Sequence, residues 1–464
     1  MVDSVVGVPL APGALPLIGH LLPLARDPLG FITSLHRTGP LVRLQLGPHP
    51  LVMVYDPALV RHVLLNPRTF DKHGPMWQRA REVTGSGLAS CPHAEHKRLR
   101  TLVQPSFHPA RIPAYAARVT DATDSLLAGW QDGSVIDLGV QMMDLITRAT
   151  VANLFGTDLP EAVRAAVAAD LNTLIKGFLP RAFAPNWITA LPLPTNRRHQ
   201  AAATRLRAVL ADIIDTRRTH EDDWSRTGSG EQRHDLLDAL INSESPPDQP
   251  GPAPGLSDEE LTDQVVTFYG AGVESTAYIL TWALALLAAH PDVEARVHDE
   301  VDRVLADGAP AHEHLDDLPY LGQVIAETLR LYSSGWFLTR TATHTTELAG
   351  LPLAAGTLIG FSTYALHRED AHFPDPERFD PDRWSHAPDR TTYIPFGAGP
   401  RKCVGDRLAL AEATAALASI TRTVRLITVN RDPLRAQSAM LLHPRRVIMK
   451  VALRRPGARP GHRA

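Results

Sequence analysis

The 464-residue sequence contains few cysteines, little net charge and a single long apolar run. Its two cysteines, Cys91 and Cys403, lie far apart, which excludes a disulfide framework and fits a reducing, cytoplasmic compartment. The net charge of −3 gives no support for binding to nucleic acid. None of the 21 histidines occurs in the H-E-x-x-H pattern of a zinc site. What remains is the composition of an ordinary globular protein, 44% hydrophobic and 21% charged.

The one long apolar run, residues 265–289, is long enough to cross a membrane. It contains Glu274, however, and a charged residue is costly in lipid. We therefore predict a helix through the centre of a large core, which opens at a capping box over residues 257–260. Residues 1–20 lack a basic start, and three prolines interrupt their apolar residues. We expect an extended N-terminal arm over residues 1–27 and no membrane span.

Other parts of the chain have weaker periodicity. Residues 71–90 show no clean period and could be a surface loop. Residues 178–194 are rich in proline and aromatic residues and are expected to form a lid-like connection. A helix is predicted over residues 204–220.

The most informative stretch is residues 396–405, F-G-A-G-P-R-K-C-V-G, followed directly by a predicted helix. A thiolate at a helix start lies near unpaired N–H groups, which favours the deprotonated form and can control a metal thiolate. The glycines, among them Gly405, let the backbone approach a flat group closely. Phe396 can cover the sulfur side of that group, and Arg401 can pair with a carboxylate on it. The pattern favours Cys403 as a metal ligand over the alternative of a buried structural cysteine.

A second motif, A-G-V-E-S-T at residues 271–276, lies inside the predicted central helix. Its two small residues let a planar group pack against the backbone. An acid beside a hydroxyl residue provides a route for protons, and a mid-helix hydroxyl can bond back to the preceding turn. The alternative is a patch of small residues that serves helix packing.

The spacing F-x-x-G-x-R-x-C-x-G resembles the haem-thiolate signature of the cytochrome P450 family, and every specified position matches. The resemblance implies a mainly helical fold with a smaller β-rich part, in one large domain over residues 1–464. The β-rich parts are expected near residues 40–55, 336–365 and 425–453. It further implies haem b between the central helix and the cysteine-loop helix, with Cys403 as the axial iron ligand. Thiolate ligation pushes electron density toward the iron and favours O–O cleavage.

The family pattern in the central helix is A-G-x-E-T-T, and this sequence departs from it at Ser275. Serine keeps the hydroxyl but lacks the methyl group that restricts the rotamers of threonine. The resemblance assigns proton delivery to Glu274 and the hydroxyl that follows it, with Ala271 against the haem. Ser275 alone, or Ser275 together with Thr276, could supply that hydroxyl.

Four basic residues are candidates for binding the haem carboxylates. His96 and Arg100 are four residues apart and share one face of a predicted helix, which suits an anionic pair. The alternative for that face is a solvated basic surface. The resemblance favours the haem-propionate role and adds Arg340, which matches a strand arginine of the family, beside Arg401.

Glu327 and Arg330 form an E-x-x-R pattern on a largely apolar predicted helix. Alone, this spacing usually marks a surface pair. The resemblance implies a buried pair beneath the haem. It is joined by an arginine of a later meander, residues 376–384, and we assign that arginine to Arg378. These three residues are expected to be structural rather than catalytic.

The predicted substrate pocket is apolar and aromatic, with candidate lining residues Trp77, Phe178, Phe183, Phe268, Trp336, Phe337 and Met440. Apolar and aromatic lining residues suit a hydrophobic small molecule as the substrate. The sequence of residues 193–198 is similar to that of bacterial family members that oxidise terpenes. We therefore favour a terpenoid or another secondary metabolite as the substrate. A fatty-acid or polyketide hydroxylase is the alternative, and Arg79 or Arg81 could anchor a fatty acid.

The resemblance implies a monooxygenase that inserts one atom of O2 into its substrate. Two electrons must come from partner proteins, because no flavin or ferredoxin module fits in the remaining chain. We expect a ferredoxin and a ferredoxin reductase as partners, and a monomeric, cytoplasmic enzyme. A peroxide-using peroxygenase is disfavoured, because that class lacks the acid–hydroxyl pair of Glu274 and Ser275. The presence of this pair also disfavours a non-catalytic haem sensor or carrier.

Overall fold

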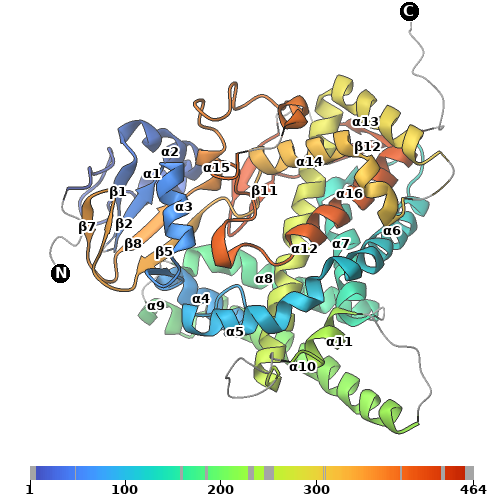
Figure 1. Cartoon of the computed structure of the whole chain (residues 1–464), viewed down its shortest axis with the longest axis horizontal. Helices are drawn as coiled ribbons and strands as arrows, with labels where there is room; N and C mark the ends of the chain where they lie inside the picture. Colours follow the sequence, from blue (N-terminus) through green and yellow to red (C-terminus); the bar gives the residue numbers. More distant parts are fainter. Residues whose placement is uncertain are drawn as a thin grey trace, which may run out of the picture.

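One long helix, α12 (Asp258–Ala289), runs through the middle of the molecule (Figure 1). The structure is a computed structural model that describes residues 7–47, 49–156, 160–182, 186–227, 235–244, 255–306, 308, 310–386, 389–429 and 434–454. α12 begins at the predicted capping box: the Ser257 hydroxyl accepts from the Glu260 N–H at 3.2 Å, and the Glu260 carboxylate accepts from the Ser257 N–H at 3.0 Å. The prediction of a central helix is confirmed.

The described chain is mainly helical, with short strands. The other helices are α1 (Leu21–Arg26), α2 (Pro28–Ser34), α3 (Pro57–Leu65), α4 (Pro75–Thr84), α5 (His93–Val103), α6 (Ile112–Ala128), α7 (Leu138–Phe155), α8 (Glu161–Ala182), α9 (Asn186–Ala190), α10 (Pro194–Thr227), α11 (Leu236–Ile241), α13 (Pro291–Val304), α14 (Pro319–Leu331), α15 (Thr363–Leu366) and α16 (Asp406–Thr423). The strands are β1 (Leu41–Leu46), β2 (His49–Val54), β3 (Phe70–Asp71), β4 (Val135–Asp137), β5 (Leu338–Ala342), β6 (Thr346–Leu348), β7 (Leu351–Leu353), β8 (Leu358–Phe361), β9 (Val424–Thr428), β10 (Ala436–Ser438), β11 (Leu442–Pro444) and β12 (Ile448–Leu453).

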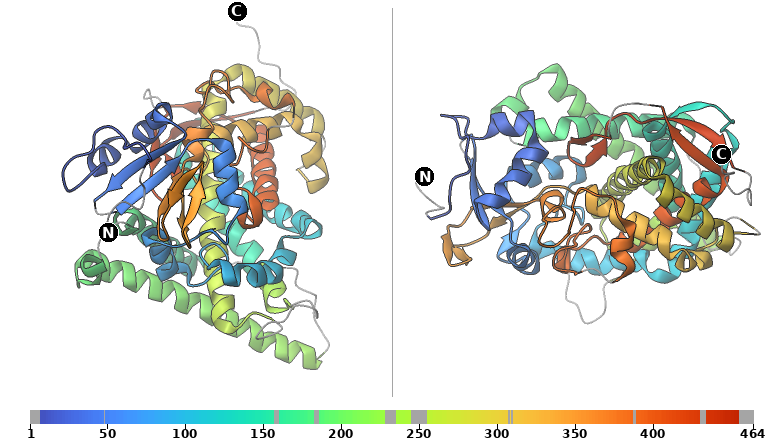
Figure 2. Two further views of the ribbon diagram at one scale, coloured as in Figure 1. Left: turned by 60° about the vertical axis from the view of Figure 1, so that its left-hand side comes forward. Right: turned by 90° about the horizontal axis from the view of Figure 1, so that it is seen from above.

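The largest sheet has five strands in the order β1-β2-β8-β5-β3. β1 and β2 are an antiparallel hairpin in which Leu41 pairs with Val54. β8 runs parallel to β2, and β5 runs antiparallel to β8 with Arg340 opposite Ile359. Figure 1 shows this sheet on the side of the N-terminus, whereas the sheet of order β4-β12-β9 lies among the helices. Most of the longer helices thus lie on the other side of the molecule from this large sheet, whereas α2 and α3 pack against it (Figure 2).

α12 belongs to both of the larger hydrophobic clusters. Its C-terminal half, which includes Leu280 and Ala283, packs with residues of α6, α7, α14 and α16. Its N-terminal half, which includes Val265 and Phe268, packs with residues of α5, α7, α10 and α11. α12 is long and apolar enough to cross a membrane, but 72% of its most apolar 18-residue window is buried inside the protein, as expected for a core helix.

Proline begins six of the helices, α2, α3, α4, α10, α13 and α14. At the first helical position proline loses no hydrogen bond, and its φ already suits a helix. This explains two differences from the sequence-based expectations. Residues 71–90 contain α4 rather than only a loop, and α10 begins at Pro194, ahead of the helix predicted over residues 204–220. Of the expected connection over residues 178–194, the described part is the end of α8, α9 and a short turn.

A fully buried ion pair joins α14 to the meander that follows the large sheet. Nε and Nη2 of Arg330 donate to the Glu327 carboxylate at 2.8 and 2.9 Å. Glu327 also accepts from Trp384 Nε1 at 2.9 Å and from the Asp380 N–H at 3.1 Å. The carboxylate is therefore satisfied on both oxygens, which a buried charge requires.

The meander arginine that contacts Glu327 is Arg383, not Arg378 as predicted. Arg383 Nε lies 3.4 Å from Glu327 Oε1, whereas Arg378 contributes its backbone carbonyl to Arg330 at 3.2 Å. The reason is the 3₁₀ turn Pro381–Ser385, which packs against α14 and carries Arg383.

We expect the Glu327→Ala variant to lose about 3–5 kcal/mol in its free energy of unfolding, because Arg330 would stay buried without its counter-charge. Asp382→Ala in the same meander breaks an exposed pair with Arg296 and should cost only about 0–1 kcal/mol. Urea denaturation followed by circular dichroism measures both. Equal losses in the two variants would contradict the structural role of Glu327.

Candidate active site

The cysteine loop between the meander and α16 is held by its own backbone. The Cys403 N–H donates to the Phe396 carbonyl at 3.0 Å. Gly399 has φ of +71°, and a Cβ there would lie 2.5 Å from the Leu64 carbonyl oxygen. Gly405 has φ of −95°, and a Cβ there would make only ordinary contacts at 3.5 Å or more. The steric need for glycine is therefore at Gly399 rather than at Gly405.

The two cysteines have different surroundings. Cys91 is fully buried, and its Sγ donates weakly to the Leu88 carbonyl at 3.6 Å. Cys403 keeps an accessible side chain just before α16. The surrounding protein raises the pKa of the Cys403 thiol by desolvation, and a hydrogen bond from the Gly405 N–H opposes this. Of the two thiols, Cys403 is the one that a ligand can reach.

Buried basic side chains gather around one carboxylate beside the cysteine loop. Arg401 Nη2 lies 2.8 Å from Asp71 Oδ1. Burial and the charge of Arg401 lower the pKa of Arg340 to about 10. Burial, followed by the charges of Arg340 and Arg401, holds the pKa of Lys72 well below its usual value. Burial and the charges of Arg401 and Lys72 lower the pKa of His96 to about 3. This cluster holds more positive charge than Asp71 can balance.

An anionic ligand would relieve this imbalance. Arg401 Nε is buried and has no hydrogen-bond partner among the described residues, so a donor is free. A group with two carboxylates, such as haem, fits both the charge and the free donor. Arg100, predicted to share this role with His96, donates to the Lys402 carbonyl at 2.7 Å and so joins α5 to the cysteine loop.

The middle of α12 is accessible along one strip. Ala271 is exposed and Ser275, one turn later, is partly exposed, although their neighbours are mostly buried. The Ser275 hydroxyl donates to the Ala271 carbonyl at 2.6 Å, as expected for a mid-helix hydroxyl. Thr276 is buried on another face. Glu274 is also buried, which raises its pKa to about 7, and its Oε2 has no partner among the described residues.

Four of the predicted pocket residues lie around the start of β5. Trp336 and Phe337 come just before it, with ring centroids 5.6 Å apart. Trp336 Nε1 donates to the Ala439 carbonyl at 3.0 Å, next to Met440. Trp77 Nε1 donates to the carbonyl of Thr339 at 3.1 Å, which brings α4 beside the same strand. The structure thus brings together predicted pocket residues from three distant parts of the sequence, two of which contribute aromatic side chains.

Three other residues were predicted to line the pocket, Phe268, Phe178 and Phe183. Phe268 lies in the core cluster of α12 and packs edge to face on Phe107, with ring centroids 5.1 Å apart. Phe183 and the side chain of Phe178 lie outside the described residues.

Asp71 and Lys72 were not predicted as part of the site. Asp71 ends β3, which pairs with β5, the strand that carries Arg340. A two-residue strand has no periodicity that a sequence could reveal. The pairing of β3 with a strand far away in the chain is what brings these residues to Arg340 and Arg401.

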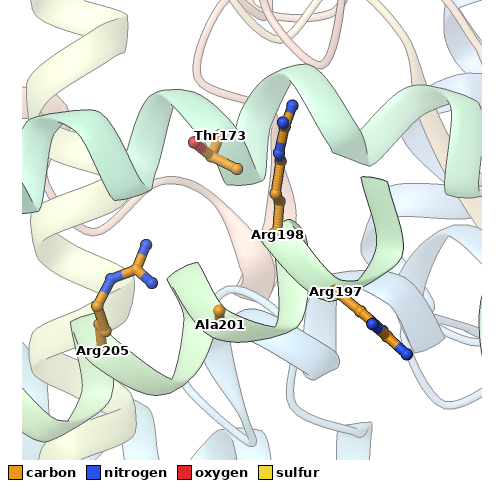
Figure 3. A pocket seen from close by; sticks show the side chains of 5 residues that line it. All are labelled: Thr173, Arg197, Arg198, Ala201 and Arg205. Atoms are coloured by element: carbon orange, nitrogen blue, oxygen red, sulfur yellow. The ribbon is translucent and has the colours of Figure 1, made fainter. Parts of the chain in front are cut away.

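A separate surface groove of about 350 Å³ lies between α8 and α10 (Figure 3). It is lined by Thr173, Arg197, Arg198, Ala201 and Arg205. Arg198 and Arg205 project toward α8, and Arg197 points away from it. Arg205 is paired with Asp170, and none of the predicted haem residues lines the groove. We therefore do not include it in the site.

The known proteins that this chain resembles indicate the same kind of site as its geometry does. The sequence model of the cytochrome P450 family matches residues 9–451. The chain is 41% identical to cyclooctat-9-en-7-ol 5-monooxygenase of Streptomyces melanosporofaciens, over 90% of this chain and 89% of that protein. It is 37% identical to pentalenene oxygenase of Streptomyces avermitilis, over 96% and 98% of the two chains. The crystal structure of the cytochrome P450DA heme domain matches with a TM-score of 0.85 at 26% identity, over 97% and 98% of the chains.

The chain belongs to the cytochrome P450 family. This P450 is a haem-dependent monooxygenase that uses O2, redox partners and a hydrophobic substrate. When bound, the haem supplies the iron centre at which O2 is activated. Cys403 is the residue that would bind the iron, and the basic side chains of Arg340, Arg401 and His96 would face the haem carboxylates.

We expect the Cys403→Ser variant to lose the red-shifted Soret band of the ferrous–CO complex, because that band reports thiolate ligation. Cys91→Ser is the matched control and should keep the band, since the Cys91 side chain is buried and its Sγ bonds to the Leu88 carbonyl. Absorption spectra of the two CO complexes make the comparison. Loss of the band in Cys91→Ser alone would contradict the assignment.

Proposed function

We propose that this P450 inserts one oxygen atom from O2 into a cyclic terpenoid or a similarly apolar secondary metabolite. The observation that carries the proposal is its similarity over about nine-tenths of its length to enzymes named for cyclooctat-9-en-7-ol and pentalenene, which are cyclic terpenes. The aromatic residues around the start of β5 are consistent with an apolar substrate. Burial of apolar surface contributes about 25 cal/mol per Å², so such a wall favours a hydrocarbon.

The fatty-acid alternative requires a basic anchor, and the two candidates for it are already engaged. Arg79 donates to the Arg181 carbonyl at 3.2 Å and to Thr189 Oγ1 at 2.8 Å, and it is also paired with Glu82. Arg81 donates to two backbone carbonyls, those of Ser90 at 2.9 Å and Lys72 at 2.6 Å. A fatty-acid carboxylate would have to displace these bonds. This supports a substrate without a carboxylate.

We further propose that Glu274 and Ser275 deliver protons. The Ser275 hydroxyl lies on the accessible strip of α12, whereas Thr276 is buried. With a pKa of about 7, Glu274 can both hold and release a proton near neutral pH. This pair supports a monooxygenase over a peroxygenase.

We also propose the cofactor, the electron donors, the cellular compartment and the oligomeric state of the enzyme. The cofactor is haem b, and the electrons come from a ferredoxin and its reductase. The enzyme acts as a cytoplasmic monomer, and residues 1–464 form one domain. Lys97 and Arg98 lie on neighbouring faces of α5 and are candidates for docking an acidic redox partner. Arg98 is paired with Glu260 at 2.6 Å, which leaves Lys97 as the better candidate of the two.

The Ser275→Ala variant should still bind substrate and accept electrons but should convert a larger share of them into hydrogen peroxide, because the hydroxyl beside Glu274 is lost. Thr276→Val is the matched control and should stay coupled, since Thr276 is buried. Product and peroxide formed per NADPH give the coupling of each variant. Loss of coupling in Thr276→Val but not in Ser275→Ala would contradict this role of Ser275 and assign it to Thr276.

Cyclic sesquiterpene hydrocarbons should bind to the wild-type enzyme and displace the axial water, which changes the haem from low spin to high spin. Medium-chain fatty acids should give a much weaker change, because Arg79 and Arg81 are engaged. Optical titration with both series measures the difference. A tight response to the acids alone, abolished by Arg79→Ala or Arg81→Ala, would contradict the terpenoid proposal.

A further inference from the structure

One buried carboxylate connects three segments that surround the basic cluster. Asp71 ends β3, where it pairs with Thr341 of β5, the residue after Arg340. Oδ2 of Asp71 accepts from the N–H of His93, the first residue of α5, at 2.8 Å. Oδ1 of Asp71 lies 2.8 Å from Nη2 of Arg401 in the cysteine loop. Asp71 therefore joins β5, α5 and the cysteine loop at one point.

The Asp71 carboxylate is itself held firmly. Oδ1 also accepts from the N–H of Lys72 at 2.7 Å, and Oδ2 lies 3.1 Å from Nε2 of His73. A carboxylate offers about four acceptor sites, so these partners, with His93 and Arg401, occupy them all. Although burial alone would raise it, the pKa of Asp71 is lowered by the bonds from the His93 and Lys72 N–H groups and by the charge of Arg401. Asp71 is therefore a charged group with a fixed orientation.

The contact with Asp71 restricts how Arg401 can lie. Only 2% of the Arg401 side chain and 4% of the Asp71 side chain are exposed, so water does not replace the contact. Asp71 holds Nη2 of Arg401, and Nη1 donates to the Cys91 carbonyl at 2.6 Å. The guanidinium is planar, so two held nitrogens also fix the direction of the third. That third nitrogen, Nε, is buried and has no partner among the described residues.

We propose that Asp71 is a positioning residue for haem binding: it fixes the Arg401 guanidinium so that Nε is presented to a haem carboxylate. The backbone N–H groups of Lys72 and His93 fix Asp71, and Asp71 in turn fixes Arg401. A free arginine side chain loses rotamer freedom when it binds a ligand, and fixing it beforehand removes much of that cost. The role concerns haem binding and is independent of the substrate proposed above.

The Asp71→Asn variant tests this proposal, because it removes the charge and keeps the size of the side chain. It should release haem about tenfold faster than the wild-type enzyme, as expected when a hydrogen bond between charged groups is lost. Transfer of haem from the ferric enzyme to an excess of apomyoglobin, followed by absorbance, gives the rate. An equal or slower rate would overturn the proposal, because Asp71 would then only compete with the haem carboxylates for the charge of Arg401.

Asp235→Asn is the matched control. Asp235 is also buried, accepts from the Asp238 N–H at 2.8 Å and pairs with Arg217 at 2.8 Å, but it joins α10 to the start of α11. Both substitutions leave a buried arginine without its counter-charge and should lower the stability of the fold. Only Asp71→Asn should speed haem release. Equal acceleration in the two variants would overturn the specific role of Asp71.

A double-mutant cycle with Arg401→Gln shows whether Asp71 acts through Arg401. If it does, the double variant should release haem about as fast as Arg401→Gln alone, because the position of a missing guanidinium no longer matters. Additive effects of the two substitutions would overturn the proposal. Asp71→Glu keeps the charge but moves it, so it should also speed release, and it replaces Asp71→Asn in the cycle if that variant does not fold.

The haem carboxylates provide a spectroscopic readout. The propionate bending band of the resonance Raman spectrum reports hydrogen bonds to these carboxylates. This band should shift in the same direction in Asp71→Asn and in Arg401→Gln and should stay in place in Asp235→Asn. A band that shifts in Arg401→Gln but not in Asp71→Asn would show that Arg401 binds haem without help from Asp71, which would overturn the proposal.

Discussion

Buried positive charge beside the cysteine loop is the constraint on which the site depends. Arg340, Arg401 and Lys72 are all removed from solvent, and Asp71 is the carboxylate paired with Arg401. A buried charge without a counter-charge is costly. The two carboxylates of a bound haem would balance these charges, which would couple cofactor binding to the stability of this region. Burial, together with the charges of Arg401 and Lys72, lowers the pKa of His96 to about 3 and so keeps its ring neutral.

α12 connects this charged side of the site to the residues proposed to deliver protons. Because the helix is part of both larger hydrophobic clusters, its middle is held firmly while one strip stays accessible. Burial on the other faces raises the pKa of Glu274 into the range useful for proton transfer. The fully buried pair of Glu327 and Arg330 likewise joins α14 to the meander.

The sequence predicted those features that depend on local patterns. The capping box at Ser257, the β-rich part near residues 40–55 and the back-bonded hydroxyl of Ser275 each involve residues close together in the chain. Two helices that begin with proline, α4 and α10, were misjudged, because the same residue both starts and breaks helices. Asp71 and Arg383 could not be assigned, since a two-residue strand and a 3₁₀ turn position them through pairing with distant segments.

As a monooxygenase, this P450 inserts one atom of O2 into a hydrophobic substrate with electrons from redox partners. The most direct measurement supplies ferredoxin, its reductase and NADPH under isotopically labelled O2, with a terpene hydrocarbon that binds. Mass spectrometry of the product then gives the source of its oxygen. We expect one labelled oxygen atom per oxidation step and little product with peroxide alone. Unlabelled product, or product formed only with peroxide, would contradict this activity.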